Sequence, residues 1–173
     1  MGGGGQARGA VPGGERLGIL GGTFDPVHVG HLVAATRARE ALGLDRVLLV
    51  VANEPWQKAG TRSVTPAEAR LAVVAAAVEG VAGLEASRLE IDRGGPSYSA
   101  DTVDELVAAR PGVVPFVVVG ADVAAELDTW HRVDDLRRAA TLVVVDRAGR
   151  APEHDPPGWR VERVAIPALD ISS

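Results

Sequence analysis

Two histidines, His28 and His31, stand three residues apart at the end of a glycine-rich segment, Gly-Gly-Thr-Phe-Asp-Pro-Val-His-Val-Gly-His at residues 21–31. A short apolar run precedes this segment and residues with helical spacing follow it, so the pattern predicts a turn between a strand and the first turn of a helix. Backbone N–H groups at such a turn, together with the positive end of the helix dipole, bind anions. Two imidazoles on one helix face favour a phosphate whose charge changes during a reaction. The alternative is a loop with two solvated histidines.

The chain contains a single lysine, Lys58, against 17 arginines. Lysine presents a compact point charge that arginine does not reproduce at a tight phosphate site. One lysine can also survive by chance, but its setting in Asn-Glu-Pro-Trp-Gln-Lys at residues 53–58 favours a functional role. We therefore predict that Lys58 contacts a phosphate group.

Aromatic residues are rare, with three tryptophans, one tyrosine and two phenylalanines in 173 residues. Two of them, Phe116 and Trp159, fall in expected strands and are predicted to be core residues. The other four follow expected strands or begin expected helices: Phe24, Trp56, Tyr98 and Trp130. This placement favours a site that stacks planar rings, and the alternative is four unrelated packing residues.

The elements that must position these residues alternate between strand and helix. Strands are predicted within residues 17–21, 46–51, 84–91, 115–119, 141–145 and 159–164, and helices over residues 28–42, from 65–68 onward, over 99–110 and near 132–139. Thr65 and Glu68 have the spacing of a capping box, with Pro66 at the first helical position. The alternation predicts an α/β fold with a doubly wound parallel sheet, in which ligands bind at the carboxyl ends of the strands.

Length and composition narrow the class of protein. A chain of 173 residues predicts one domain that can bury a substantial core. There is no cysteine, which excludes disulfides and thiolate metal sites. The four histidines do not form a metal-ligand constellation, so a bound metal is expected to arrive with phosphates. No P-loop, no Gly-x-Gly-x-x-Gly after the first strand and no Gly-x-Ser-x-Gly elbow occur, which disfavours P-loop kinases, dehydrogenases and α/β-hydrolases.

Charge and hydropathy bear on partners and location. The net charge of −5 argues against a nucleic-acid surface. No apolar run is long enough to span a bilayer, and the Gly-rich start lacks the apolar core of a signal peptide. We therefore expect a cytoplasmic protein with neither a nucleic-acid nor a membrane partner.

The segment at residues 21–31 resembles the nucleotide-binding signature of the nucleotidylyltransferase superfamily, which includes pantetheine-phosphate adenylyltransferases. Four further segments occur in order: residues 53–58, Gly-Pro-Ser-Tyr-Ser-Ala-Asp-Thr at 95–102, Gly-Ala-Asp at 120–122 with Trp130 eight residues on, and Asp-Ile-Ser-Ser at 170–173. Together they closely resemble the bacterial nicotinate-nucleotide adenylyltransferases over residues 17 to 173. The resemblance implies a Rossmann-like nucleotidyltransferase fold.

The chain departs from that family at two places. Ser99 stands where the family often has threonine, which keeps the hydroxyl. The family's last motif continues with a threonine and a triphosphate-contacting arginine and then a final helix, whereas this sequence stops at Ser173. We expect residues 1–15 to form a disordered Gly-rich tail. Residues 16–173 are expected to form a single nucleotidyltransferase domain, truncated at its C-terminus.

The resemblance implies adenylyl transfer from ATP to nicotinate mononucleotide, giving deamido-NAD and pyrophosphate in NAD biosynthesis, with Mg²⁺ carried by the ATP phosphates. The catalytic residues would be His28, His31 and Lys58. The implied ATP-binding residues are Gly21, Gly22, Thr23, Phe24, His28, His31, Gly120, Asp122 and Ser172. The implied mononucleotide-binding residues are Asn53, Trp56, Lys58, Tyr98, Ser99 and Trp130.

Alternatives remain at three levels. Asp122 is either an acceptor for a ribose hydroxyl or the N-cap of a helix. The enzyme could be another adenylyltransferase of the superfamily, such as the pantetheine-phosphate type, or the chain could be a nucleotide-binding domain without turnover. The sequence leaves the oligomeric state open, a homo-oligomer included.

Overall fold

A computed structural model of the chain describes residues 13–56, 60, 63–147 and 154–168. Its strands form one six-stranded sheet in the order β3-β2-β1-β4-β5-β6, and all neighbouring strands are parallel. The strands are β1 (Arg16–Gly22), β2 (Arg46–Val51), β3 (Leu84–Ser87), β4 (Val114–Gly120), β5 (Thr141–Arg147) and β6 (Val161–Ile166). The helices are α1 (Val29–Leu42), α2 (Ala67–Val78), α3 (Leu89–Arg93), α4 (Ser99–Ala109), α5 (Ala121–Ala124) and α6 (Val133–Ala139), with a 3₁₀ turn η2 (Leu127–Thr129).

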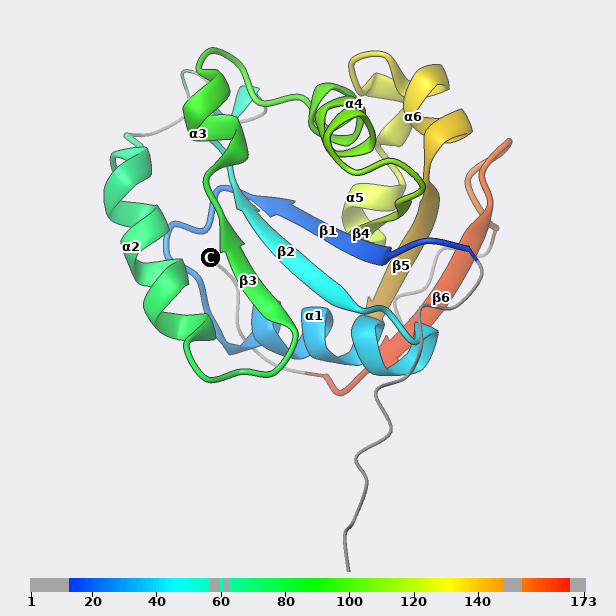
Figure 1. Cartoon of the computed structure of the whole chain (residues 1–173), viewed down its shortest axis with the longest axis horizontal. Coiled ribbons are helices and arrows are strands. Elements are labelled where there is room, and N and C mark those ends of the chain that lie inside the picture. The colour runs from blue at the N-terminus through cyan, green and yellow to red at the C-terminus, as the bar shows by residue number, and fades with distance from the viewer. Residues whose placement is uncertain (1–12, 57–59, 61–62, 148–153, 169–173) are drawn as a thin grey trace, which may run out of the picture.

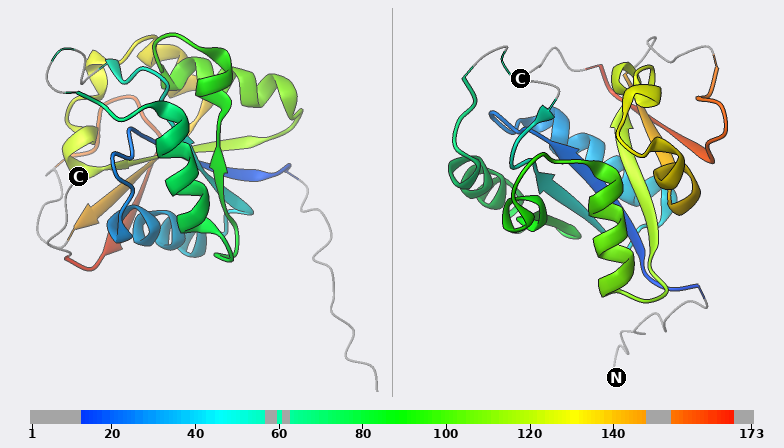
Figure 2. Two further views of the ribbon diagram at one scale, coloured as in Figure 1. Left: turned by 90° about the vertical axis from the view of Figure 1, so that its left-hand side faces the viewer. Right: turned by 90° about the horizontal axis from the view of Figure 1, so that it is seen from above.

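The order of the strands confirms the doubly wound α/β fold. From β1 the chain moves outward to β2 and β3, returns to β4 beside β1, and then moves outward in the other direction. Helix α1 lies on one face of the sheet, and α4 and α6 lie on the other (Figure 1, Figure 2). Because the two halves wind away from each other, a crevice opens between the carboxyl ends of β1 and β4.

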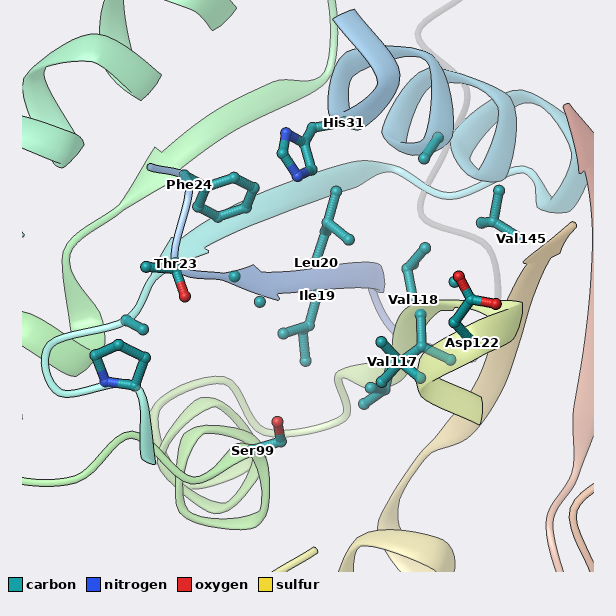
Figure 3. Close-up of a pocket in the computed structure, with 18 of the residues that line it drawn as sticks. Ile19, Leu20, Thr23, Phe24, His31, Ser99, Val117, Val118, Asp122 and Val145 are labelled. Carbon is teal, nitrogen blue, oxygen red and sulfur yellow. The ribbon is translucent and has the colours of Figure 1, made fainter. Parts of the chain in front are cut away.

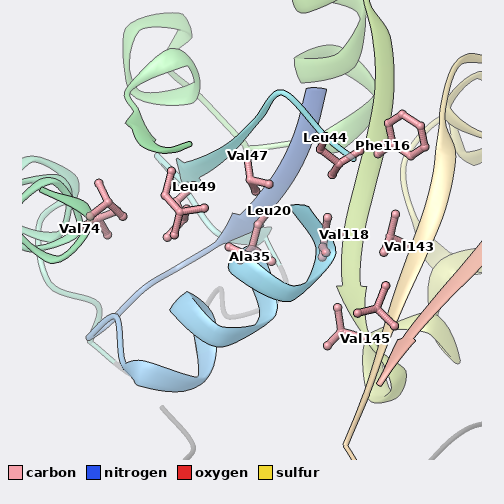
Figure 4. Close-up of a cluster of buried hydrophobic side chains, with 14 of the residues drawn as sticks. Leu20, Ala35, Leu44, Val47, Leu49, Val74, Phe116, Val118, Val143 and Val145 are labelled. Carbon is pink, nitrogen blue, oxygen red and sulfur yellow. The ribbon is translucent and has the colours of Figure 1, made fainter. Parts of the chain in front are cut away.

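The sheet separates two hydrophobic clusters, because successive strand residues point to opposite faces. On β1, Leu20 joins the cluster under α1 and α2, while Leu17 and Ile19 join the cluster under α4 and α6. Figure 4 shows the first cluster, where Ala35 of α1 packs near Leu20. Burial on both faces explains why the strands read as uninterrupted apolar runs.

Two predicted strands differ from the structure. The strand predicted within residues 84–91 ends at Ser87, and a short helix, α3, follows it. Leu89 and Ile91 pack against different clusters, so their apolar-polar-apolar alternation suggested a strand. The last strand begins at Val161 instead of residue 159, and Trp159 precedes it, 5.9 Å from the guanidinium of Arg137.

The predicted capping box at α2 is wrong. The N-cap is Pro66, and no side chain caps the helix. Thr65 is engaged in another way, since its N–H donates to Asp25 Oδ2 at 2.9 Å and its carbonyl accepts from Arg70 Nε at 2.7 Å. Its backbone therefore joins the loop after β1 to α2.

The tail predicted for residues 1–15 lies outside the described residues up to residue 12. Glu15, assigned to that tail, belongs to the folded part, because its carboxylate pairs with Arg46 and with Arg110, the latter at 3.0 Å. Burial raises the pKa of Glu15, but the contacts with Arg46 and Arg110 lower it more, so the pKa lies below its ordinary value. Within the described ranges, none of the helices has the length and apolar character needed to cross a bilayer.

Candidate active site

The two histidines interlock at the start of α1. His28 is the N-cap, and its Nδ1 accepts from the Gly30 N–H at 3.1 Å. His31 reaches back, so that its Nδ1 accepts from the His28 N–H at 3.1 Å. The rings stack, with centroids 3.8 Å apart and an interplanar angle of 26°. The predicted sharing of one face is confirmed.

These backbone contacts select a tautomer for both rings. A neutral imidazole whose Nδ1 accepts a hydrogen bond carries its proton on Nε2. Burial, and after it the positive charge of Arg147, lowers the pKa of His28 below its ordinary value. His28 is therefore neutral near pH 7 and keeps its Nε2–H as a donor. His31, held in the same way, offers a second Nε2–H beside it.

Four glycines near the site differ in the space that an added Cβ atom would meet. A Cβ on Gly22 would lie 3.1 Å from the Phe24 ring, and one on Gly30 would lie 2.8 Å from His28 Cε1. These two glycines are needed for the packing of the rings. At Gly21 and Gly120, nothing lies within 4 Å of the added atom. A side chain there would enter open space at the carboxyl ends of β1 and β4.

That space is a cavity of about 400 Å³. Figure 3 shows His31 on one side of it, Ser99 on the opposite side and Asp122 on the short helix α5. The cavity brings together residues predicted from four separate segments of the sequence. Those that line it are Gly21, Gly22, Thr23, Phe24, His28, His31, Trp56, Tyr98, Ser99, Gly120, Asp122 and Trp130.

Aromatic rings form part of the wall, and all four rim aromatics predicted from the sequence lie there. Tyr98 is central, with its ring centroid 6.3 Å from Trp56 and 4.3 Å from His131. Phe24 differs from the others, since it is 2% exposed and meets His31 edge-on at 4.9 Å. Its ring therefore supports a histidine.

Asp122 does not cap α5. The N-cap of that helix is Gly120, and no side chain caps it. The alternative role left open for Asp122 is therefore not seen, and its exposed carboxylate lines the cavity.

A family model described as cytidylyltransferase-like matches residues 19–173. A nicotinate-nucleotide adenylyltransferase of Corynebacterium kroppenstedtii is 44% identical over 161 residues, which cover 91% of this chain and 76% of the relative. One of Thermus thermophilus is 44% identical over 158 residues, covering 91% of this chain and 82% of the relative. The chain belongs to the nicotinate-nucleotide adenylyltransferase family.

A solved structure of low sequence identity has the same fold as this chain. A Plasmodium falciparum nicotinic acid mononucleotide adenylyltransferase complexed with NaAD superimposes with a TM-score of 0.76 at 15% identity, over 90% of this chain and 77% of that one. The relatives and the family model confirm the resemblance drawn from the motifs, and the chain is a nucleotidyltransferase. The pantetheine-phosphate alternative is not the family of these relatives.

Three predicted site residues are not found in the cavity wall: two lie outside the described residues, and one contacts neighbouring loops instead. Lys58 and Ser172 lie outside the described residues. Asn53 does not line the cavity: its N–H donates to Ser97 Oγ at 2.8 Å and its Nδ2 to the Gly95 carbonyl at 3.0 Å. Asn53 thus connects the loop after β2 to the loop before α4.

Sequence reasoning missed Arg70, which organises the loops beside the cavity. Its side chain is buried on α2, and its guanidinium donates to the carbonyls of Thr23 at 2.7 Å and Asn53 at 3.4 Å as well as to Thr65. Burial lowers the pKa of Arg70. One signal was available, because Arg70 continues the buried stripe of Val74 and Val78 at intervals of four.

Three ionisable residues of the cavity wall were also missed. They are Arg147 at the end of β5, His131 beside Tyr98, and Glu90 on α3. Arg147 contributes positive charge close to the histidines, as its effect on His28 indicates. Glu90 is buried, although it carries an ionisable group.

Proposed function

We propose that the chain transfers the adenylyl group of ATP to nicotinate mononucleotide, giving deamido-NAD and pyrophosphate. The observation that carries this proposal is the stacked pair of His28 and His31, whose Nδ1 atoms are both held by backbone N–H groups at the mouth of the β1–β4 crevice. The names of the relatives support the choice of substrates, as does the Plasmodium falciparum complex with NaAD.

The chemistry requires no covalent enzyme intermediate. An oxygen of the mononucleotide phosphate attacks the α-phosphorus of ATP, and the bond from that phosphorus to the pyrophosphate oxygen breaks. Negative charge then develops on the transferring group and on the departing pyrophosphate. Nε2–H donors fixed before the reaction stabilise this charge without reorganisation. We assign that role to His28 and His31, and Lys58 would add charge from the facing loop.

The two substrates would occupy different parts of the cavity. Gly21 and Gly120 leave room for ATP to approach the ends of β1 and β4, and Thr23 also lines this part of the cavity. Asp122 would accept from a ribose hydroxyl. The pyridine ring would lie against Trp130, near Tyr98 and Ser99, and Trp56 would close this side of the wall.

Mg²⁺ would enter with the ATP phosphates. Among the described residues, no group of three or more histidine, aspartate or glutamate side chains could hold a metal ion. The residues facing the phosphates are N–H donors, which suit phosphate oxygens and not a bare cation. When bound to the triphosphate, the ion would neutralise charge on the departing pyrophosphate.

A coupled pyrophosphate-release assay tests the proposal. ATP and Mg²⁺ are supplied with nicotinate mononucleotide, nicotinamide mononucleotide or phosphopantetheine, and we expect turnover with the first. Turnover with phosphopantetheine alone would contradict the choice of substrate. Binding of ATP without turnover of any acceptor would show a nucleotide-binding domain that is not an enzyme.

Two neighbouring glycines separate a ligand effect from a packing effect. Gly21→Ala should leave the melting temperature near that of the unmodified protein but weaken ATP binding by about tenfold or more, because its methyl group displaces the ligand from a close approach. Gly22→Ala is the matched control and should lower stability by about 1–3 kcal/mol, because its Cβ meets the Phe24 ring. Calorimetric titration with ATP and thermal unfolding measure both. Equal ATP affinity in Gly21→Ala would contradict the placement of ATP.

The protein should prefer nicotinate to nicotinamide mononucleotide. Helix α4 begins at Ser99 with Tyr98 as its N-cap, and no side chain caps the amides of its first turn. These amides complement a carboxylate better than a neutral carboxamide, so we expect a preference of at least about tenfold in kcat/KM. Ser99→Asp places a like charge there and should shrink or reverse the preference. Equal use of both mononucleotides by the unmodified protein would remove the carboxylate site and leave the adenylyl transfer.

A further inference from the structure

Glu90 is a buried acid in the cavity wall that the proposed chemistry does not use. It is 6% exposed on α3 and lines the cavity together with Ser97, Tyr98 and Ser99. The same wall is where the carboxylate of the pyridine ring is proposed to bind. A buried carboxyl group beside a site for a second carboxylate calls for a physical account, because like charges at close range disfavour each other.

Hydroxyl groups of two neighbouring residues contact the Glu90 carboxyl group. Thr102 Oγ1 donates to Glu90 Oε1 at 2.6 Å, and Ser97 also hydrogen-bonds the carboxyl group. Arg93 donates to Thr102 Oγ1 at 3.2 Å and pairs with Glu105 at 3.1 Å. Arg93 therefore pairs with another carboxylate, and it acts on Glu90 electrostatically.

The charge state of Glu90 follows from these surroundings. Burial raises its pKa above the ordinary value, and Glu105 raises it further, while Thr102, Ser97 and Arg93 act in the opposite direction. The other ionisable side chains that line the cavity are His28, His31, Tyr98, Asp122, His131 and Arg147. A second carboxylate arriving at this wall would raise the pKa of Glu90 again.

We propose that Glu90 is a specificity-determining residue. It takes up a proton from solvent when a mononucleotide that bears a carboxylate binds. When Glu90 is ionised, it weakens the binding of that ligand relative to the carboxamide analogue. This inference rests on the proposed function. The proton is bound on a carboxyl oxygen of Glu90 while the ligand carboxylate is present and returns to solvent when the carboxylate leaves. Glu90 contributes no bond to the reacting phosphorus.

The sign of the pH dependence follows from linkage. Protonated Glu90 favours the acid ligand, so the preference for nicotinate over nicotinamide mononucleotide should fall as pH rises through the pKa of Glu90. The phosphate and ribose of the two mononucleotides are the same, so their own titration cancels in the ratio of kcat/KM values. A mutual shift of one pKa unit corresponds to about tenfold in affinity. We therefore expect the ratio of kcat/KM values to fall about tenfold from the acid to the alkaline side of the titration of Glu90.

The test compares this ratio in the unmodified protein, Glu90→Gln and His131→Asn. Glu90→Gln should make the ratio independent of pH and, at the alkaline end, higher than in the unmodified protein. His131→Asn is the matched control, since His131 lies beside Tyr98 in the same wall and a positive charge there would favour the acid ligand with the same sign. It should retain the pH dependence. Persistence of the slope in Glu90→Gln, or its loss in His131→Asn, would overturn the proposal.

Two measurements keep the test decisive if Glu90→Gln folds poorly. Thr102→Val removes a donor that favours the ionised form, so the midpoint of the ratio should move to higher pH. Titration calorimetry of the unmodified protein in two buffers of different ionisation enthalpy should give more proton uptake with nicotinate than with nicotinamide mononucleotide. Equal uptake with both ligands would overturn the role of Glu90.

The outcomes also separate this inference from the proposed function. Turnover of nicotinate mononucleotide with a pH-independent preference would refute the role of Glu90 alone. Binding of the mononucleotides without turnover would refute adenylyl transfer and leave the calorimetric comparison to decide on Glu90. Binding of neither would refute both.

Discussion

His31→Ala should lower kcat by roughly 10²-fold or more while changing the KM values for both substrates less, because a preorganised donor to developing charge is worth about that much. His31 lines the cavity, and its Nδ1 accepts from the backbone N–H of His28, so the neutral ring donates through Nε2–H. Steady-state and single-turnover rates with ATP and nicotinate mononucleotide measure the effect.

The same substitution also removes a helix cap, and this second effect has to be separated. His31 occupies the third position of α1, where glutamine commonly reaches back to the N-cap N–H. His31→Gln should therefore keep the cap, which is worth about 1 kcal/mol, and still lose the turnover. If His31→Gln retained near-normal kcat, His31 would be a capping residue and its assignment to the transition state would be wrong.

The segment at residues 21–31 was predictable because its determinants are local. A strand, a glycine-rich turn and a helix start follow one another in the chain, so the spacing of the histidines and glycines already places them together. Their role as reciprocal caps was not predictable, since histidine is not among the residues that favour the N-cap. The two stacked rings replace the side chains that usually do this.

The strands were also predictable, because burial on both faces of a parallel sheet demands continuous apolar runs. The short helix α3 was not, since Leu89 and Ile91 reach two different clusters and so alternate like strand residues. The buried position of Glu90 depends on that helix, so it was missed with it.

Contacts to backbone carbonyls leave no signature in the sequence. For this reason the contacts of Arg70 and Asn53 could not be predicted. Arg70 donates to carbonyls of loops that lie 47 and 17 residues away along the chain. Asn53 donates its side-chain N–H to a carbonyl 42 residues away. Any residue type supplies a carbonyl, so a motif indicates that Asn53 matters without indicating what it contacts. Its assignment to the mononucleotide remains a prediction.

Trp130→Ala should weaken the binding of nicotinate mononucleotide by about 1–3 kcal/mol and leave ATP binding nearly unchanged, by analogy with bases stacked on aromatic side chains. Trp130 lines the cavity directly after η2, on the side of α4. Arg132 holds this position, since it pairs with Asp101 and Asp104 of α4 at 2.9 and 2.8 Å. Titration calorimetry with each substrate separately measures both affinities.

Packing is the competing explanation, because Trp130 also contacts the hydrophobic cluster under α4 and α6 and its buried Nε1 has no hydrogen-bond partner among the described residues. Trp159 offers a matched control. It packs against the same cluster, and its buried Nε1 also has no hydrogen-bond partner among the described residues, but it does not line the cavity. Trp159→Ala should therefore lower the melting temperature without a selective loss of mononucleotide affinity. Compared with Trp130→Ala, Trp130→Phe should be more stable, since it keeps a ring and removes the unpartnered donor. It should also recover part of the affinity for the mononucleotide. Because stacking acts on one substrate and packing on the whole fold, an equal loss of affinity for ATP and the mononucleotide in Trp130→Ala would assign Trp130 to the core.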